Sequence, residues 1–298
     1  MVSTMVPKRN NELHWKRNNG SCIFGGIPEG YTGKETGVLL RLKLLPNLKP
    51  DDNVLSIGCA VGAHLQPLKK RGLQTIGLDP EHRFLLEGKA RGNAHNFIQA
   101  IGENTPLRDR AFDIVLIFEV LEHVIQPSKV LREAHRVLKP DGRLFITAPN
   151  KFYPFETHGL QVGQKQIENL LGIGIPFFSM APNFLRRRFE RARIYDSAEL
   201  ISLLRRNGFE PIRIDFMMPP LDKVRQAPII LALRKILLFL SRLSLVKRFG
   251  VSIIIVTKKR ALKHSCARME QSYTLRSDNV NLSSYNFLEV FDRNWFRI

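Results

Sequence analysis

The stretch VLSIGCAVG, from Val54 to Gly62, decides the fold of this 298-residue chain. Its first half is apolar, which favours a buried strand. Its second half carries glycines typical of a tight turn that opens a helix. Backbone N–H groups at such a turn can bind a polar or anionic ligand. Two positions depart from the usual pattern: Ser56 stands where a carboxylate is expected, and Ala60 stands where a second glycine is expected.

On both sides of this stretch, short apolar runs alternate with helical patterns. The strand candidates are Asn53–Gly58, Gln74–Asp79, Asn96–Ala100, Phe112–Phe118 and Arg143–Ala148, followed by PIRIDFMM and SIIIVTK late in the chain. Helical stretches lie between most of them, notably Pro127–Pro140, where four apolar residues share one face. This alternation predicts an α/β fold with a doubly wound, mostly parallel sheet that is covered on both faces.

The composition changes along the chain and suggests three parts. Residues 1–29 are polar and basic and predict a flexible tail, residues 30–260 hold the alternating pattern, and residues 261–298 form a polar C-terminal extension. Within the main domain, residues 150–195 are aromatic and rich in Pro and Gly. We expect an insertion there, after the fifth strand.

Charge and cysteine content limit the functional classes. The net charge of +19 calls for an anionic partner, which is nucleic acid, a membrane surface or an acidic substrate. Three scattered cysteines argue against a disulfide framework or a zinc site and fit a reducing compartment. Residues 1–20 have no apolar core of a secretory signal. We therefore expect a cytoplasmic protein, peripheral to a membrane if it contacts one.

An acidic residue at the second strand supports a nucleotide site. Asp79 ends that strand, 21 residues after Gly58, and a carboxylate there can accept hydrogen bonds from ribose hydroxyls. The alternative is that Asp79 is only a turn residue before Pro80.

Five segments occur in an order that identifies a family. They are VLSIGCAVG, IGLDP, ENTPLRDRAFDIVLIFEVLEHV, VLREAHRVLKPDGRLFITAPN and DSAELISLLRRNGF. Together they resemble class I S-adenosylmethionine-dependent methyltransferases of the small-molecule type, similar to the quinone-biosynthesis O-methyltransferases. The resemblance covers roughly residues 34–258. It implies a Rossmann-like sheet of seven strands with the last strand antiparallel beside the sixth, and a substrate lid in residues 150–195.

The same resemblance implies S-adenosylmethionine as the cofactor and assigns its binding residues. The candidates are Ser56, Gly58, Ala60, Gly62, Asp79, Gly102, Glu103 and Phe118. The glycines would line the methionine moiety, Asp79 would hold the ribose, and residues 101–103 would lie along the adenine edge. Ser56, Ala60 and Ile101 depart from the family pattern, and each is expected to weaken binding. The methyl group of Ala60 is costly only where φ is positive.

An oxygen or nitrogen acceptor can need a proton acceptor beside it. The candidate catalytic residues are His123, His158 and Glu119, with Glu122 beside them. We expect Glu122 and His123 to start the helix after the fourth strand, where His123 either acts on the acceptor or only packs. His158 follows the fifth strand, where it serves the substrate or is a plain loop residue. No metal site is expected, because the histidines lack metal-ligand spacing.

Residues 184–263 carry 19 Lys and Arg against 6 Asp and Glu, so most of the positive charge is there. Their amphipathic stretch Ala227–Phe249 suits an anionic membrane surface, and in quinone-type relatives the lid region can touch membrane. The same apolar face would equally pack on the sheet. The first hypothesis is methyl transfer to an O or N of a small or lipid-linked acceptor. The alternatives are an RNA-modifying methyltransferase, which tracks phosphates with this basic surface, and a non-catalytic methyltransferase-like scaffold.

Overall fold

The computed structural model divides the chain into two units, Met1–Ala261 and Leu262–Ile298. The structure describes residues 36–42, 45, 48–156, 160–162, 165–167, 175–189, 192–219, 236, 239 and 244–260, all of which belong to the first unit. The predicted tail at residues 1–29 and the predicted extension at residues 261–298 lie outside the described residues.

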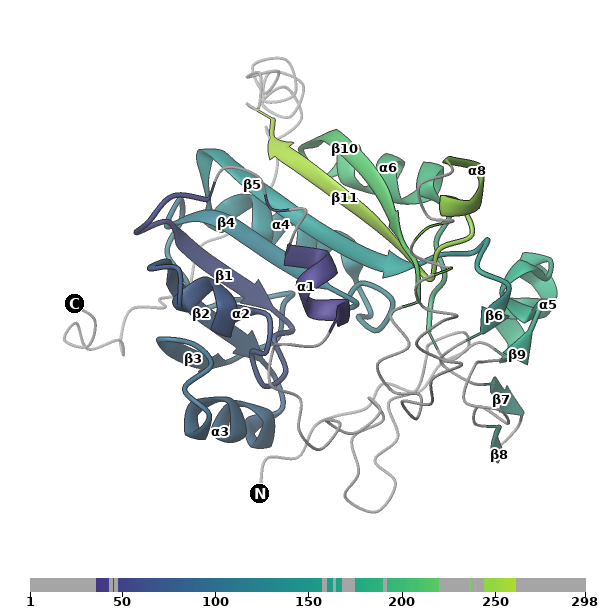
Figure 1. The fold of residues 1–298 in the computed structure, drawn as a ribbon, viewed down its shortest axis with the longest axis horizontal. Helices are drawn as coiled ribbons and strands as arrows, with labels where there is room; N and C mark the ends of the chain where they lie inside the picture. The colour runs from purple at the N-terminus through teal and green to yellow at the C-terminus, as the bar shows by residue number, and fades with distance from the viewer. Residues whose placement is uncertain are drawn as a thin grey trace, which may run out of the picture. The chain divides into compact units, whose positions relative to one another are not determined.

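A seven-stranded sheet forms the centre of the first unit (Figure 1). Its strands are β1 (Asn53–Ile57), β2 (Gln74–Asp79), β3 (Asn96–Gln99), β4 (Phe112–Phe118), β5 (Leu138–Pro149), β10 (Phe209–Met217) and β11 (Ser252–Lys259). The order across the sheet is β10-β11-β5-β4-β1-β2-β3. β11 is antiparallel to both of its neighbours, and the remaining pairs are parallel. The predicted α/β fold with the last strand antiparallel beside the sixth is confirmed.

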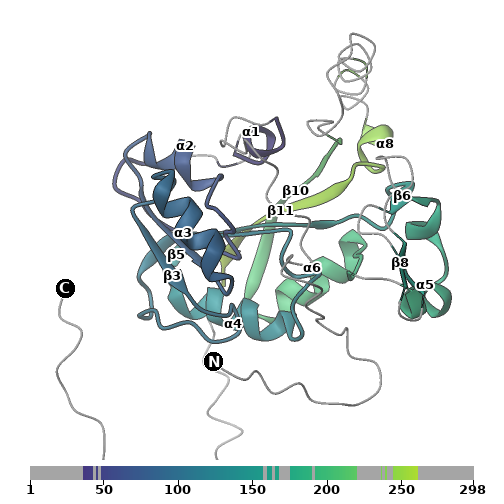
Figure 2. The same cartoon turned by 90° about the horizontal axis from the view of Figure 1, so that it is seen from below.

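Helices cover both faces of the sheet, as Figure 2 shows. The helices of the first face are α1 (Thr36–Leu42), α2 (Leu65–Lys69) and α3 (His82–Ala90), and those of the second are α4 (Pro127–Val137) and α6 (Ser197–Arg206). Each set packs with the strand residues of its face in a separate apolar core. On α4 the residues that face the core are Val130, Leu131, Ala134 and Val137. The inner strands are therefore buried on both faces, which explains their continuous apolar runs, whereas the edge strands β3 and β10 are partly exposed.

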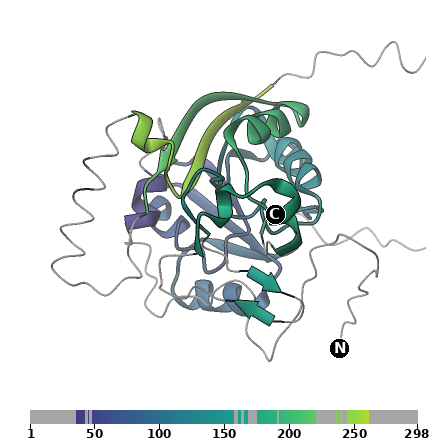
Figure 3. The same ribbon diagram turned by 90° about the vertical axis from the view of Figure 1, so that its right-hand side faces the viewer.

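The chain leaves the sheet after β5 and returns at α6. The intervening elements are β6 (Phe155–Glu156), β7 (Leu160–Val162), β8 (Lys165–Ile167), β9 (Ile175–Pro176), a 3-10 turn η1 (Phe178–Met180) and α5 (Asn183–Phe189). Figure 3 turns this side of the unit toward the viewer. The insertion expected after the fifth strand is present.

The helix predicted at Ala227–Phe249 lies mostly outside the described residues, which include α8 (Ser244–Lys247) near its end. Within the described part of the chain, none of the helices combines the length and the apolar character that crossing a membrane requires.

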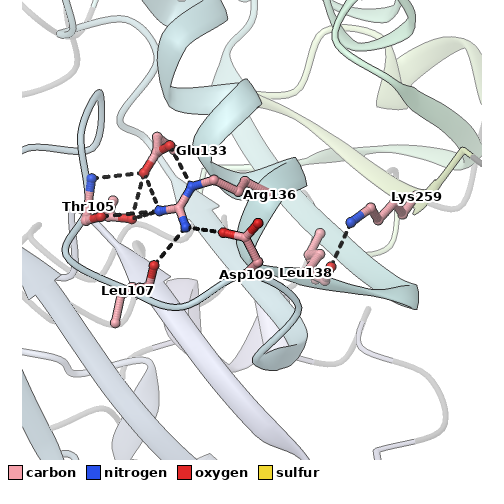
Figure 4. A network of polar contacts seen from close by, with 7 residues as sticks. All are labelled: Thr105, Leu107, Asp109, Glu133, Arg136, Leu138 and Lys259. Carbon is pink, nitrogen blue, oxygen red and sulfur yellow. Dashed lines mark hydrogen bonds and ion pairs between the residues drawn. The ribbon is translucent and has the colours of Figure 1, made fainter. Parts of the chain in front are cut away.

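A polar network, which we call the Arg136 network, fixes the loop before β4 onto α4 (Figure 4). The Arg136 guanidinium donates to Glu133 Oε2 at 2.7 Å and to Asp109 Oδ1 at 2.6 Å. It also donates to the carbonyl oxygens of Thr105 at 3.1 Å and Leu107 at 2.7 Å. Glu133 in turn accepts from the Thr105 N–H and hydroxyl. Hydrogen bonding from Arg136 lowers the pKa of Glu133 to about 2.

Candidate functional site

The turn after β1 has left-handed backbone at three positions. Gly58 has φ of 67° and Gly62 has φ of 72°, and Ala60 between them has φ of 47°. A Cβ on Gly58 would lie 2.5 Å from a methyl carbon of Val120, so this position also requires glycine for space. Because φ is positive at Ala60, its methyl group strains the backbone, with an expected cost of about 1–2 kcal/mol. The turn nevertheless has the shape of a ligand-binding turn.

Asp79 holds this turn in place. Its Oδ2 accepts from the Ala60 N–H at 2.8 Å, and its Oδ1 accepts from the Glu81 N–H at 2.9 Å. The second hydrogen bond closes a turn around Pro80, which agrees with the alternative interpretation of Asp79 as a turn residue. Burial raises the pKa of Asp79. Asp79 is thus a structural residue of the turn, and each carboxylate oxygen still has a lone pair for a ribose hydroxyl.

The other cofactor candidates lie at or near the carboxyl edge of the parallel strands. Ser56 is buried inside β1, paired in register with Gly77 and Leu116. Gly102 is buried in a short turn, where a Cβ would lie 2.8 Å from Ile57. Glu103 is half-buried in the same turn, whereas Ile101 is 53% exposed. An exposed isoleucine offers an apolar surface and no hydrogen bond at this edge.

Phe118 ends β4 and Glu119 follows it, beside residues that sequence reasoning did not select. Glu119 has a left-handed φ of 54°, and its Oε1 accepts from Arg41 Nη2 of α1 at 3.3 Å. The ring of the half-buried His64 lies edge-on to Phe118, with centroids 5.0 Å apart. Burial, together with the charge of Arg41, lowers the pKa of His64 to about 3. The sequence signal for Arg41 is a basic residue within the otherwise apolar run VLLRL, residues 38–42.

Glu122 is the most unusual acid of this edge. Its side chain is fully buried, and neither carboxyl oxygen has a hydrogen-bond partner among the described residues. His123 Nε2 lies 3.8 Å from Glu122 Oε1. Burial, followed by the negative charge of Glu119, raises the pKa of Glu122 well above its usual range. A buried carboxyl that favours its neutral form beside an ion pair is a common feature of functional sites.

The prediction that Glu122 and His123 start the following helix is wrong. Both lie in a turn, and α4 begins at Pro127. Proline suits the first helical position because its missing N–H would have no partner there. The four residues Arg41, His64, Glu119 and Glu122 are called the Arg41 cluster below. Within the described residues, Arg41 Nε and His64 Nε2 are also buried without a hydrogen-bond partner.

His158, the remaining catalytic candidate, lies outside the described residues. In the part of the chain that is described, no three side chains of His, Cys, Asp or Glu are arranged to hold a metal ion. The assignment of His123, Glu119 and the cofactor-binding residues stays a prediction from the resemblance.

Comparison with known families matches a methyltransferase domain to residues 55–146. Among curated proteins, a ubiquinone biosynthesis O-methyltransferase of Bradyrhizobium diazoefficiens is 34% identical over 102 residues, covering 33% of this chain and 40% of the relative. A demethylmenaquinone methyltransferase of Renibacterium salmoninarum is 34% identical over 110 residues, covering 36% of this chain and 46% of the relative. A thiol S-methyltransferase of Rattus norvegicus is 36% identical over 121 residues, covering 38% and 49%. The chain thus spans less than half the length of these relatives.

Solved structures share the fold over about three quarters of this chain. A methyltransferase solved in complex with the Trm112 activator of Haloferax volcanii has a TM-score of 0.53 at 17% identity, covering 78% of this chain and 90% of that one. An S-adenosylmethionine-dependent methyltransferase from Mesorhizobium loti has a TM-score of 0.51 at 15% identity, covering 74% and 96%. The chain therefore contains a methyltransferase domain with the Rossmann-like fold, and this domain implies S-adenosylmethionine as its cofactor.

Proposed function

We propose that this chain transfers a methyl group from S-adenosylmethionine to a small acceptor of the phenolic, quinone-precursor type. The observation that carries the proposal is the Arg41 cluster, which lies beside the left-handed turn of a methyltransferase domain. Charged groups that are buried and incompletely paired are costly to fold, so they favour a ligand that completes their pairing.

The residues of this edge fit the two charged ends of the cofactor's methionine part. Among the described residues, the buried Nε of Arg41 has no hydrogen-bond partner, and its guanidinium would hold a carboxylate. Glu119 is partly exposed, with 28% of its side chain accessible, and its carboxylate would hold an ammonium. Glu119 would thereby supply the negative charge that Ser56 does not. Asp79 would hold the ribose while it keeps the turn closed.

S-adenosylmethionine, when bound, supplies an activated methyl group, and the protein supplies position and proton transfer. His123 is the described residue best suited to take a proton, since it lies next to Glu122 and part of its side chain is accessible. Glu122 would position the ring of His123. His158, which lies outside the described residues, remains a second proposed acceptor of the proton.

The name of the ubiquinone biosynthesis O-methyltransferase supports an oxygen atom as the acceptor, and the name of the demethylmenaquinone methyltransferase supports only the quinone class. The thiol relative makes sulfur the first competitor. The insertion supports an apolar, membrane-associated acceptor. Phe184 is 82% exposed and Phe177 is 69% exposed, and the Arg188 guanidinium lies 6.0 Å from the centre of the Phe189 ring. Exposed aromatic side chains beside cations suit the surface of an anionic membrane.

The test of the proposal is calorimetric titration of S-adenosylmethionine and S-adenosylhomocysteine, followed by assays with a phenolic quinone precursor and with an aliphatic thiol. We expect binding of both cofactor forms and methylation of the phenol. Failure of the wild-type protein to bind either form would overturn the proposal and favour the non-catalytic scaffold. Methylation of the thiol alone would overturn the acceptor class.

Membrane association has a separate test. We expect Phe184→Ser and Arg188→Glu to reduce sedimentation with anionic vesicles, and Leu86→Ser, which changes an exposed apolar residue on α3, to leave it unchanged. Arg186 is not a suitable target, because only 3% of it is exposed and its Nη1 donates to the Ile194 carbonyl oxygen at 3.3 Å. Equal sedimentation of all variants would count against a membrane role.

A further inference from the structure

A pocket of about 260 Å³ is lined by residues of α5, α6 and the start of α4. Three arginines line it, Arg186 of α5, Arg193 of the following loop and Arg206 of α6, and Glu199 is the acid in its lining. Three guanidinium groups against one carboxylate make the wall net positive. Guanidinium groups suit phosphate, because their planar N–H pairs match its oxygen atoms.

Two of these arginines keep their positive charge available. Arg193 donates to the backbone carbonyl oxygens of Val124 and, at 3.1 Å, Ile125, which are neutral partners and leave its charge uncompensated. Arg206 is exposed and makes no hydrogen bond or ion pair with any residue that the structure describes. An entering anion would therefore not have to displace an acid from either guanidinium.

The start of α4 adds to the same potential. Pro127, the first residue of this eleven-residue helix, lines the pocket, and Gln126 before it makes no side-chain capping bond. The N-terminal end of a helix carries a partial positive charge that favours an anion nearby. The pocket thus combines two uncompensated arginines with a helix N-terminus.

We propose that this pocket binds a phosphate monoester or diphosphate group. Its residues also hold the turn that carries Glu122 and His123: the Arg193 N–H donates to the Glu122 carbonyl oxygen at 3.1 Å, and the Tyr195 hydroxyl donates to the Leu121 carbonyl oxygen at 3.0 Å. A phosphate bound to Arg193 would therefore restrict the motion of the turn that carries Glu122 and His123. The proposal concerns a second site and does not rest on methyl transfer.

Four proteins test the site by calorimetric titration with inorganic phosphate and pyrophosphate at physiological salt. Arg206→Gln should weaken binding about tenfold or more, because it removes one charge-assisted contact. Arg205→Gln is the matched control on the same helix, since Arg205 pairs with Glu210 and does not line the pocket. Glu199→Gln should strengthen binding, and glutamine can still complete the capping box at the start of α6.

Two further probes separate a soluble ligand from a lipid headgroup. Competition by a soluble phosphate monoester would support a small phosphorylated ligand. Arg206-dependent binding only to vesicles that contain phosphatidic acid would support a lipid headgroup with the same chemistry. The proposal fails if the wild-type protein binds neither probe. It also fails if Arg205→Gln and Arg206→Gln weaken binding equally, because that result would reflect the general positive charge of the protein.

Discussion

Two charged clusters of this domain lie next to β4 and differ in how completely their groups are paired. In the Arg136 network, the guanidinium contacts two carboxylates and two carbonyl oxygens, all on α4 and the loop before β4. In the Arg41 cluster, which lies at the end of β4, one ion pair of 3.3 Å joins Arg41 to Glu119, while the carboxyl oxygens of Glu122 and the Nε2 atom of His64 are buried without a hydrogen-bond partner among the described residues.

The difference in pairing predicts a structural role for the Arg136 network and a ligand-binding role for the Arg41 cluster. Complete pairing lowers the free energy of the folded state with no ligand present, so the Arg136 network stabilises the fold. Incomplete pairing raises it, and such a cluster persists where the surrounding fold tolerates the cost for the sake of a ligand. Substitutions in the Arg136 network should therefore mainly change the free energy of unfolding. Substitutions in the Arg41 cluster should mainly change the affinity for the cofactor.

The largest expected effect on stability comes from Arg136→Met. We expect the free energy of unfolding to fall by about 2–3 kcal/mol, because Glu133 and two carbonyl oxygens lose their donor. Denaturant titration measures it, and Arg132→Met, which changes an exposed residue of the same helix, should cost under about 0.5 kcal/mol. Affinity for S-adenosylhomocysteine should not change, and a loss of affinity would break the contrast between the clusters.

The pH dependence sharpens this prediction. Glu133 has a pKa of about 2 in the folded state, below the ordinary value of 4.5. Its carboxylate therefore contributes stability above pH 4.5, and this contribution is lost as the pH falls toward 2. The destabilisation by Arg136→Met should accordingly shrink between pH 5 and pH 2. A destabilisation that stays constant across this range would show that the ion pair is not its source.

Arg41→Gln tests the other cluster. We expect affinity for S-adenosylhomocysteine to fall about tenfold or more, which corresponds to one lost charge-assisted hydrogen bond of about 1.5–3 kcal/mol. The free energy of unfolding should change by less than about 1 kcal/mol, because glutamine can still donate to Glu119. Calorimetry gives the first value and denaturant titration the second, with Arg71→Gln as an exposed control. A stability loss with unchanged affinity would make Arg41 a structural residue.

Glu122→Gln tests whether the buried carboxyl of Glu122 is neutral, through the pH dependence of the free energy of unfolding. The folded-state pKa of Glu122 lies above its ordinary value, so its contribution to stability is present below pH 4.5 and is lost as the pH rises through the folded-state pKa. Glutamine does not titrate, so the variant should gain stability relative to the wild type between pH 5 and pH 8. Denaturant titrations at both values measure this, with the exposed Asp141→Asn as control. A pH-independent difference would contradict a neutral Glu122.

Much of the fold was predictable, because strands buried on both faces have continuous apolar runs that survive in the sequence. The turn at Gly58 and the carboxylate at Asp79 were also predictable, because each lies at the end of such an apolar run. Arg41 and His64 were not, since their role arises from packing between α1, the turn and β4, which no local pattern encodes. The start of the helix after β4 was misjudged, because Pro127, and not Glu122, fits the first helical position.

The smallest expected effect concerns Ala60, the non-glycine residue in the left-handed part of the turn. Ala60→Gly should raise the free energy of unfolding by about 0.5–1 kcal/mol, because relief of the Cβ strain exceeds the added freedom of the unfolded chain. Ala63→Gly is the matched control, since Ala63 is buried without positive φ and its replacement should destabilise the fold. If Ala60→Gly also tightens S-adenosylhomocysteine binding, the strain at Ala60 limits the cofactor turn. If it stabilises the fold with unchanged affinity, the turn already holds its binding geometry through Asp79. Destabilisation by Ala60→Gly would show that the methyl group packs favourably.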